Sequence, residues 1–279
     1  MLKSFMFVPA NNLRFITKSN ELLADYIVYD LEDAVLSDEL DMCFNNLLSV
    51  QLESNQLVRF SVFDENSNLN ERDFEQLLKL GFRKFVVPKF SGVYQAEALK
   101  GFLEKYNSYE NVSFVLLIEG PGSLLSIYDV LSRNLINVNA IALGSHDYCN
   151  AMGMKHTDSN LYFAKQMILN HAKAFGIEAI DTVSVNIEDD VEFKSESLDG
   201  FNMGFDGKFV IHPRQVSLLK GVVYYTPEEV LEAELVYDKV TDIVDKKTAV
   251  VRINGKVFEK PHVKRIINIM NWKHKNEAK

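Results

Sequence analysis

The sequence predicts a (β/α)8 TIM barrel with a C-terminal helical extension, and three observations support this fold. Eight short apolar runs are spread through the first 213 residues, each about as long as a buried strand. Segments with helical periodicity lie between them, and this alternation is typical of a parallel sheet. Most runs end in charged or polar residues, and a barrel keeps its active site at these strand ends. The runs are residues 4–9, 26–33, 57–61, 85–89, 113–120, 140–148, 178–184 and 209–213.

Helices are predicted between these runs because apolar residues recur there every three to four positions. Gly81 and Gly176 follow two of the segments directly, and glycine is a common residue at a helix end. The predicted helices span residues 11–24, 38–51, 70–80, 94–105, 124–133, 159–175 and 188–203.

The pattern changes after residue 220, so we expect a barrel over 1–220 and an extension over 221–279. Thr226 and Pro227, followed by two glutamates, predict a helix start, and this helix should reach about residue 244. An extended piece at 249–254 then turns at Asn254-Gly255, and a last helix begins near Pro261. The first helix carries apolar residues that must be buried somewhere, namely Val230, Leu231, Leu235, Val236 and Val240.

The composition is that of an ordered, acidic protein of 279 residues, with 47% hydrophobic residues and a formal net charge of −9. This charge argues against binding to nucleic acid or to an anionic membrane. No apolar stretch approaches the roughly 20 residues of a membrane span, and the N-terminus has no signal-peptide pattern. The two cysteines, Cys43 and Cys149, lack metal-binding spacing, and we expect a cytoplasmic protein.

Two carboxylates are candidates for a metal site. Glu119 and Asp147 come at the ends of the fifth and sixth predicted strands, so the fold should bring them close together. Two carboxylates in one pocket repel each other unless a proton or a cation lies between them. Their oxygens suit Mg²⁺, which takes one or two carboxylates and leaves its other positions to water and substrate. The alternative is that both are strand-end caps or salt-bridge partners.

Further charged residues follow the second, third and fourth predicted strands. Asp30 and Glu32 share one strand face, where one of them can touch a metal-bound water, whereas Asp33 can also cap the next helix. Arg59 interrupts an apolar run, so it either pairs with these acids or binds a substrate carboxylate or oxyanion. Lys89 is placed similarly and is a candidate for substrate binding. A lysine there also allows Schiff-base chemistry, which a metal would make redundant.

Two histidines at strand ends, His146 and His212, are interpreted as structural hydrogen-bonded residues. No HxxxH pattern or Ser/His/Asp set accompanies them. The chain also lacks a Walker A sequence and a GxGxxG after a strand, so the sequence indicates no common nucleotide-binding loop.

Ten segments follow one another as FVPANN, YDLEDAV, VRF, VPK, LIEGPGSLL, IALGSHDY, AIDTVS, GFDGKFVIHPRQVSLL, TPEEV and INGKVFEKP. In this order they resemble the citrate lyase β-subunit-like proteins of the wider HpcH/HpaI aldolase and malyl-CoA lyase group, over nearly the whole chain. The resemblance implies a TIM barrel, usually trimeric, and a Mg²⁺-dependent carbon–carbon lyase. Such an enzyme splits a hydroxy-acyl thioester into a keto acid and an acetyl-type thioester, or runs the reverse condensation.

The resemblance also implies roles for the polar strand ends. Glu119 and Asp147 match the family's metal ligands. Arg59 matches the arginine that meets the keto-acid oxygen, and Glu32 matches an acidic residue beside metal-bound water. The substrates that the resemblance implies are citryl, citramalyl or malyl thioesters.

At the thioester end, Phe7 and Lys18 match the places that grip coenzyme A. Glu259 stands where a C-terminal segment carries an aspartate, reaches a neighbouring subunit's site and works on the thioester α-proton. Glutamate adds one methylene there, and Asn12 stands where CoA-using members often carry arginine. The metal end is therefore unchanged and the thioester end is altered, so the carrier is either CoA or an acyl-carrier protein.

The expected partners are thus a small keto acid, an acyl thioester and further copies of the chain in a homotrimer. Two other functions stay open on the sequence. One is a metal-dependent aldolase or hydrolase that acts on a free acid without a thioester carrier. The other is a non-catalytic binding or scaffold protein that keeps the barrel, which the complete metal ligands argue against.

Overall fold

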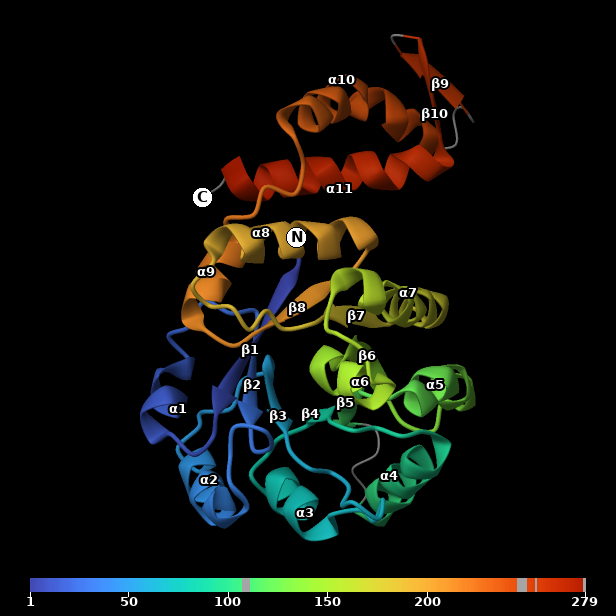
Figure 1. Cartoon of the computed structure of the whole chain (residues 1–279). Helices are drawn as coiled ribbons and strands as arrows, with labels where there is room; N and C mark the ends of the chain where they lie inside the picture. The colour runs from blue at the N-terminus through green and yellow to red at the C-terminus, as the bar shows by residue number, and fades with distance from the viewer. Residues whose placement is uncertain (107–110, 245–249, 254, 278–279) are drawn as a thin grey trace. The chain divides into compact units, whose positions relative to one another are not determined.

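Eight parallel strands form a closed barrel in chain order, which confirms the predicted fold class (Figure 1). The computed structural model describes residues 1–106, 111–244, 250–253 and 255–277. Pairing of β1 with β8 closes the ring of strands. The strands are β1 Lys3–Pro9, β2 Tyr26–Asp30, β3 Gln56–Arg59, β4 Lys84–Val87, β5 Ser113–Ile118, β6 Val138–Leu143, β7 Glu178–Asp181 and β8 Gly207–Val210.

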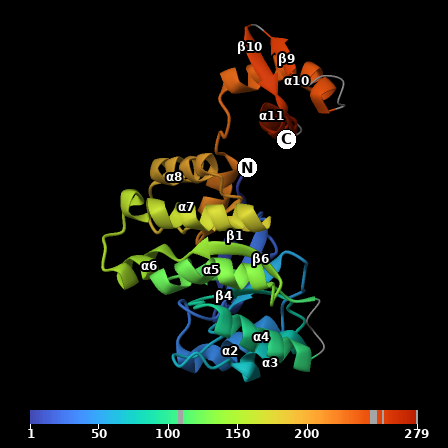
Figure 2. The same ribbon diagram turned by 90° about the vertical axis from the view of Figure 1, so that its right-hand side faces the viewer.

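Helices surround these strands in both views (Figures 1 and 2). The longer ones pack an apolar stripe inward, as α3 does with Phe74, Leu77 and Leu78 at helical spacing. None of the described helices is long and apolar enough to cross a membrane. The helices of the barrel are α1 Leu13–Ser19, the 3-10 turn η1 Ser37–Glu39, α2 Leu40–Leu47, α3 Glu71–Lys79, α4 Val93–Lys105, α5 Pro121–Arg133, α6 Ser145–Met152, α7 Asp158–Phe175, α8 Asp190–Met203 and α9 Pro213–Lys220.

Apolar side chains from alternate strand positions fill the barrel interior. On β5, Val115 and Leu117 belong to this core, and Glu119 follows at the next alternate position. On β1, Phe5 and Phe7 belong to the same core. Polar groups at inward positions are therefore confined to the two ends of the barrel. The acidic residues among them lie at the carboxyl ends of the strands.

The sixth strand is shorter than the sequence predicts, and a helix that was not expected follows it. The apolar run continues to Tyr148, but β6 ends at Leu143. Gly144 donates the last ladder hydrogen bond to the carbonyl of Ile118 and accepts the first helical one from Tyr148. Asp147 therefore lies in the first turn of α6, and its prediction as a strand-end residue is wrong.

The last predicted strand is also shorter than expected, since β8 ends at Val210 and a helix, α9, begins at Pro213. His212 caps it, since its Nδ1 accepts a hydrogen bond from the backbone N–H of Arg214, and Pro213 stands at the first helical position. Asn12 has the same task at α1, where its side chain accepts from the N–H groups of Arg14 and Phe15. The asparagine that departs from the CoA-using pattern is thus a helix cap here.

A second compact unit follows the barrel, and the chain divides between Leu2–Val222 and Val223–Lys279. It contains α10 Pro227–Val244, the antiparallel strands β9 Val250–Ile253 and β10 Lys256–Glu259, and α11 Lys260–Glu277. The sequence places the division after residue 220. The predicted turn residue Asn254 lies outside the described residues.

The extension has an apolar core of its own. Val236 of α10 is buried there with Phe258 of β10 and Ile266 of α11, and Val230 packs against the same cluster. Two residues of the predicted apolar face, Leu231 and Leu235, are 58% and 57% exposed. The side chain of Val240 lies outside the described part of the chain. Burial of Leu231 and Leu235 against a neighbouring subunit stays a prediction.

Candidate active site

A buried ion pair joins two neighbouring strands at the carboxyl end of the barrel. Asp30 ends β2, Arg59 ends β3, and the two residues are partners in the strand register. Arg59 donates to the Asp30 carboxylate from Nε at 2.8 Å and from Nη2 at 2.6 Å. This bidentate arrangement fixes the plane of the guanidinium, and the two side chains are only 11% and 3% exposed.

The other end of the guanidinium meets the loop that follows β2. Arg59 Nη1 lies 2.9 Å from Asp33 Oδ2 and 3.3 Å from Glu32 Oε2. One face of the guanidinium covers the ring of Phe7, with Cζ 4.5 Å from the ring centroid. Burial lowers the pKa of Arg59, but the hydrogen bond to Asp30 and the nearby carboxylates raise it overall above its ordinary value. The predicted pairing with the acidic residues is present, and substrate binding by Arg59 stays a prediction.

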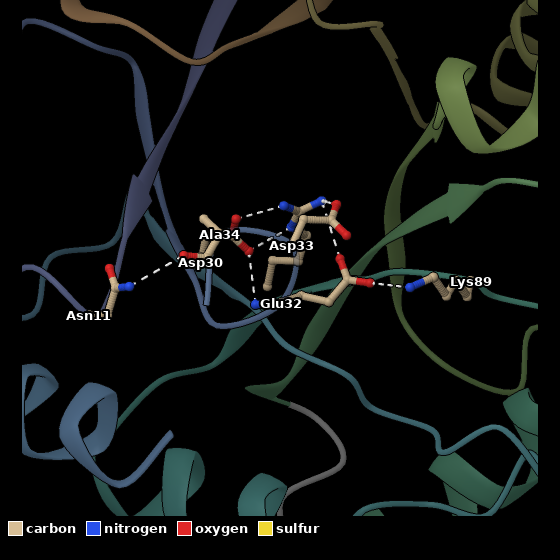
Figure 3. Close-up of polar contacts among 7 residues, drawn as sticks. Asn11, Asp30, Glu32, Asp33, Ala34 and Lys89 are labelled. Atoms are coloured by element: carbon tan, nitrogen blue, oxygen red, sulfur yellow. Dashed lines mark hydrogen bonds and ion pairs between the residues drawn. The ribbon is translucent and has the colours of Figure 1, made fainter. Parts of the chain in front are cut away.

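The carboxylate of Glu32 lies between two cations. Lys89 Nζ donates to Glu32 Oε1 at 2.7 Å (Figure 3). Glu32 Oε2 is buried and has no hydrogen-bond partner among the described residues, although Arg59 Nη1 is near. Burial raises the pKa of Glu32, while the charge of Arg59 and the hydrogen bond from Lys89 oppose that shift. A buried carboxylate oxygen without a donor is unusual and leaves a position for water or a cation.

The loop that carries Glu32 and Asp33 is fastened to the loop after β1. Asn11 Nδ2 donates to Glu39 Oε2 at 2.9 Å. It also donates to the carbonyl of Ala34 at 3.3 Å (Figure 3). Asp33 does not cap the next helical turn, which starts several residues later, so that alternative is wrong. Its carboxylate pairs with the guanidinium instead.

Lys89 contacts two carboxylates through two different groups. It follows Pro88 after β4 with φ of 50°, a left-handed conformation that residues with a side chain rarely adopt. Its backbone N–H donates to Glu119 Oε2 at 2.6 Å, while its ammonium reaches Glu32. The hydrogen bond with Glu32 raises the pKa of Lys89. A lysine that stays protonated is a poor nucleophile, which disfavours the Schiff-base alternative.

Glu119 is a buried carboxylate without a matching cation. The residue is 9% exposed at the end of β5. Burial, the charge of Glu32 and the charge of Asp147 together raise the pKa of Glu119 to about 8, against the opposing hydrogen bond from Lys89. A Cβ added to Gly144 would lie 2.4 Å from Glu119 Cγ. The carboxylate thus lies in a cradle that a glycine leaves open.

The five carboxylates in this cluster outnumber its cations, which are Arg59 and Lys89. In the part of the chain that the structure describes, no three His, Cys, Asp or Glu side chains are grouped to hold a metal by themselves. A divalent ion that takes one or two carboxylates and completes its shell with water and substrate suits this set, and Mg²⁺ binds in this way. The donor set therefore fits Mg²⁺.

The remaining predicted residues lie in different places. Lys18 is exposed in the last turn of α1, and no described contact joins it to the carboxylate cluster. Glu259 ends β10 in the second unit, where its backbone N–H donates to His262 Nδ1 at 3.0 Å. His146 stacks on His156, with ring centroids 4.2 Å apart, and His212 has the structural role that was expected.

Two residues of this site were missed in the sequence. Gly144 gives the Glu119 carboxylate its space, and Asn11 fixes the loop with Glu32. A glycine directly after an apolar run is a visible signal for the first. The asparagine carries no such signal, because its partners are known only once the two loops are placed.

Comparisons with known proteins identify the family of this chain. The family model for HpcH/HpaI aldolase/citrate lyase matches residues 3–213. The citrate lyase subunit beta of Haemophilus influenzae is 30% identical over 279 residues, covering 94% of this chain and 94% of that protein. The mitochondrial citramalyl-CoA lyase of Homo sapiens is 27% identical over 83% of this chain and 74% of that protein.

A solved structure has the same fold. It is the crystal structure of protein CitE from Mycobacterium tuberculosis in complex with magnesium, acetoacetate and coenzyme A. It matches with a TM-score of 0.80 and 19% identity and covers 97% of both chains. The named relatives are lyases, which confirms the predicted enzyme class. The chain is therefore an enzyme that belongs to the HpcH/HpaI aldolase/citrate lyase family.

Proposed function

We propose that this lyase is Mg²⁺-dependent and acts on a 3-hydroxy-acyl thioester such as a citryl, citramalyl or malyl thioester. The products are a keto acid and an acetyl-type thioester, carried on coenzyme A or an acyl-carrier protein. The observation that carries the proposal is the buried Glu119 carboxylate, with its pKa raised to about 8, beside a fixed arginine. A neighbour of the same fold holds magnesium, acetoacetate and coenzyme A, which supports this substrate class.

Glu119 and Asp147 are the proposed metal ligands, and the unsatisfied oxygen of Glu32 is the proposed acceptor for a metal-bound water. When bound, Mg²⁺ supplies Lewis acidity at the keto-acid carbonyl. The raised pKa of Glu119 means that a cation competes with a proton for this carboxylate near neutral pH. These three residues would thus hold a Mg²⁺ ion at one end of the substrate, and the ion would supply the positive charge that the cluster lacks.

Arg59 stabilises negative charge on the oxygen of the keto-acid part. In cleavage, the substrate hydroxyl gives its proton to water and becomes the keto carbonyl, the carbon–carbon bond breaks, and the electrons of that bond pass to the acetyl unit as an enolate. Asp30 holds the guanidinium plane still, so the donor needs little reorganisation during the reaction. Phe7 backs the guanidinium and, with Lys18 and Lys89, is proposed to line the path of the thioester.

Glu259 is the proposed acid–base group that returns a proton to the enolate carbon, or removes it in the reverse direction. We propose that it acts on the site of a neighbouring copy in a homotrimer. The exposed Leu231 and Leu235 of α10 support a surface that is covered in the assembly. We also propose a cytoplasmic location.

A substrate panel tests the function. Citramalyl-CoA, malyl-CoA and citryl-CoA are assayed for keto-acid release with Mg²⁺ and with EDTA, alongside the three free acids. We expect release from at least one thioester with Mg²⁺ and none with EDTA. Release from a free acid alone would favour the aldolase or hydrolase without a carrier. Activity that persists in EDTA would contradict the metal site.

The shared site is tested by mixing two inactive chains. One ends at Val222 and keeps the barrel, and the other carries Arg59→Ala with an intact extension. Mixed oligomers combine an intact barrel with an intact Glu259 in some sites, so partial activity should return. A monomer at micromolar concentration, or a mixture without activity, would remove the role proposed for Glu259.

A further inference from the structure

One partner of Arg59 is held less firmly than the others. The side chains of Asp30 and Glu32 are 3% and 6% exposed, whereas that of Asp33 is 56% exposed. Asp33 nevertheless keeps Oδ2 2.9 Å from Arg59 Nη1, the distance of a charge-assisted hydrogen bond. Asp33 can therefore leave the arginine for water at low cost, which the two buried carboxylates cannot.

The other approaches to the guanidinium are already taken. Asp30 occupies the edge formed by Nε and Nη2, and the ring of Phe7 covers one face. At Nη1, Glu32 is fixed from its far side by Lys89. A substrate oxygen that replaces a carboxylate at this arginine therefore replaces Asp33.

We propose that the Asp33 carboxylate is a stand-in for a carboxylate or carbonyl oxygen of the keto acid, and that the substrate binds by displacing it from Arg59 Nη1. This inference rests on the proposed function, because it takes a keto acid as the ligand of Arg59. Asp33 is thus a specificity-determining residue. It keeps the arginine paired in the absence of substrate, so that only a ligand with a well-placed oxygen of its own takes the position.

Arg59 loses little in the exchange, because one oxygen that accepts a hydrogen bond from Nη1 replaces another. The substrate must offset the free energy of the exposed ion pair between Asp33 and Arg59, and an exposed ion pair contributes little to stability. Removal of Asp33 should therefore tighten keto-acid binding by about two- to fivefold, the factor that corresponds to a weak exposed pair. A merely structural acidic residue would give the opposite sign, because its loss loosens the loop and weakens binding.

Calorimetry with pyruvate and saturating Mg²⁺ measures this effect on the full-length protein. Four proteins are compared: the unchanged chain, Asp33→Ala, Asp33→Asn and Arg59→Lys. Asp38→Asn is the matched control, because it removes the same charge from the exposed 3-10 turn η1 of the same connection. A crystal structure with Mg²⁺ and pyruvate adds a direct view of which oxygen faces Nη1.

We expect tighter pyruvate binding for both Asp33 variants, unchanged binding for Asp38→Asn, and pyruvate in the place of Asp33 in the crystal. Unchanged or weaker binding by the Asp33 variants, with Arg59→Lys still impaired, overturns the stand-in alone. Equal tightening in Asp38→Asn also overturns it, because the effect is then one of overall charge. If the unchanged chain does not bind pyruvate, or Arg59→Lys binds it equally well, the proposed function fails first.

Discussion

Two clusters of charged side chains lie on opposite sides of the barrel wall, and they differ in the balance of positive and negative groups. The mouth cluster, inside the barrel, holds five carboxylates and two cations, with Glu119 and Arg59 among them. The outer cluster, between β7, β8 and the helices, pairs two carboxylates with two lysines. Its members are Lys165, Asp181, Glu196 and Lys208.

The outer cluster is balanced in charge, although both oxygens of the buried Asp181 carboxylate lack a hydrogen-bond partner among the described residues. Lys208 is 1% exposed and donates to the carbonyl of Thr182 at 2.9 Å. Its Nζ lies 3.7 Å from Asp181 and 3.8 Å from Glu196, and Lys165 lies 3.1 Å from Asp181. Buried charges of equal number hold an element in place, whereas a surplus of one sign is a cost that a protein keeps for function. The surplus of carboxylates thus makes the mouth cluster the better candidate for the functional site.

Glu119→Gln should have the largest effect and separate stability from function. Between pH 4.5 and about 8, folded Glu119 keeps a proton that the unfolded chain loses, so its contribution to stability falls as pH rises. Glutamine never carries that charge. The metal-free variant should therefore be more stable than the unchanged chain above pH 8, by on the order of 3 kcal/mol. Activity and Mg²⁺ binding should be lost.

Thermal unfolding in EDTA at pH 5 and pH 9 checks this result. The difference in melting temperature between the two proteins should be small at pH 5 and largest at pH 9. In separate melts with Mg²⁺ in place of EDTA, only the unchanged chain should be stabilised. Glu196→Gln is the matched control from the balanced cluster and should not stabilise the protein. A Glu119→Gln variant that is less stable at pH 9 would show that this carboxylate is compensated after all.

Lys208→Met should reverse the pattern. It leaves Asp181 and Glu196 without a shared cation in a buried site, and the loss of one partner from such a group costs about 3–5 kcal/mol. The melting temperature should fall by roughly 10 °C, on the usual scale for a domain of this size. Mg²⁺ binding, measured by calorimetry below the transition, should stay within about threefold. A stable variant with lost metal binding would break the division into two clusters.

The sequence allows the barrel to be predicted because each strand is an apolar run long enough to be recognised alone. Strand ends are less certain. The run before Tyr148 conceals the break at Gly144, since α6 is one short helix with no repeated apolar stripe. Charged partners depend on register. That Asp30 and not Glu32 takes the Arg59 fork follows only from their pairing across β2 and β3.

Arg59→Lys should come next in size. Lysine keeps the charge but loses the fork that Asp30 grips from Nε and Nη2. We expect kcat to fall by about a hundredfold, the scale for loss of one preorganised donor. Mg²⁺ affinity should change little, because the arginine is not a metal ligand. Turnover close to that of the unchanged chain, with the fold verified by circular dichroism, would leave Arg59 as a structural partner only.

Gly144→Ala should have the smallest effect on stability and still reach the metal site. The new Cβ would lie 2.4 Å from Glu119 Cγ and 2.7 Å from Oε1, so the glutamate side chain must shift. Overpacking of this kind costs about 1–3 kcal/mol. Because Gly144 has an ordinary negative φ of −79°, alanine adds no backbone strain, and the effect belongs to the side-chain contact alone.

We expect the Mg²⁺ affinity of Gly144→Ala to fall by about tenfold, the scale for disturbed ligand support. Gly122→Ala is the control, since a Cβ there has nothing within 4 Å. Equal Mg²⁺ affinity in the two alanine variants would mean that the cradle does not position Glu119.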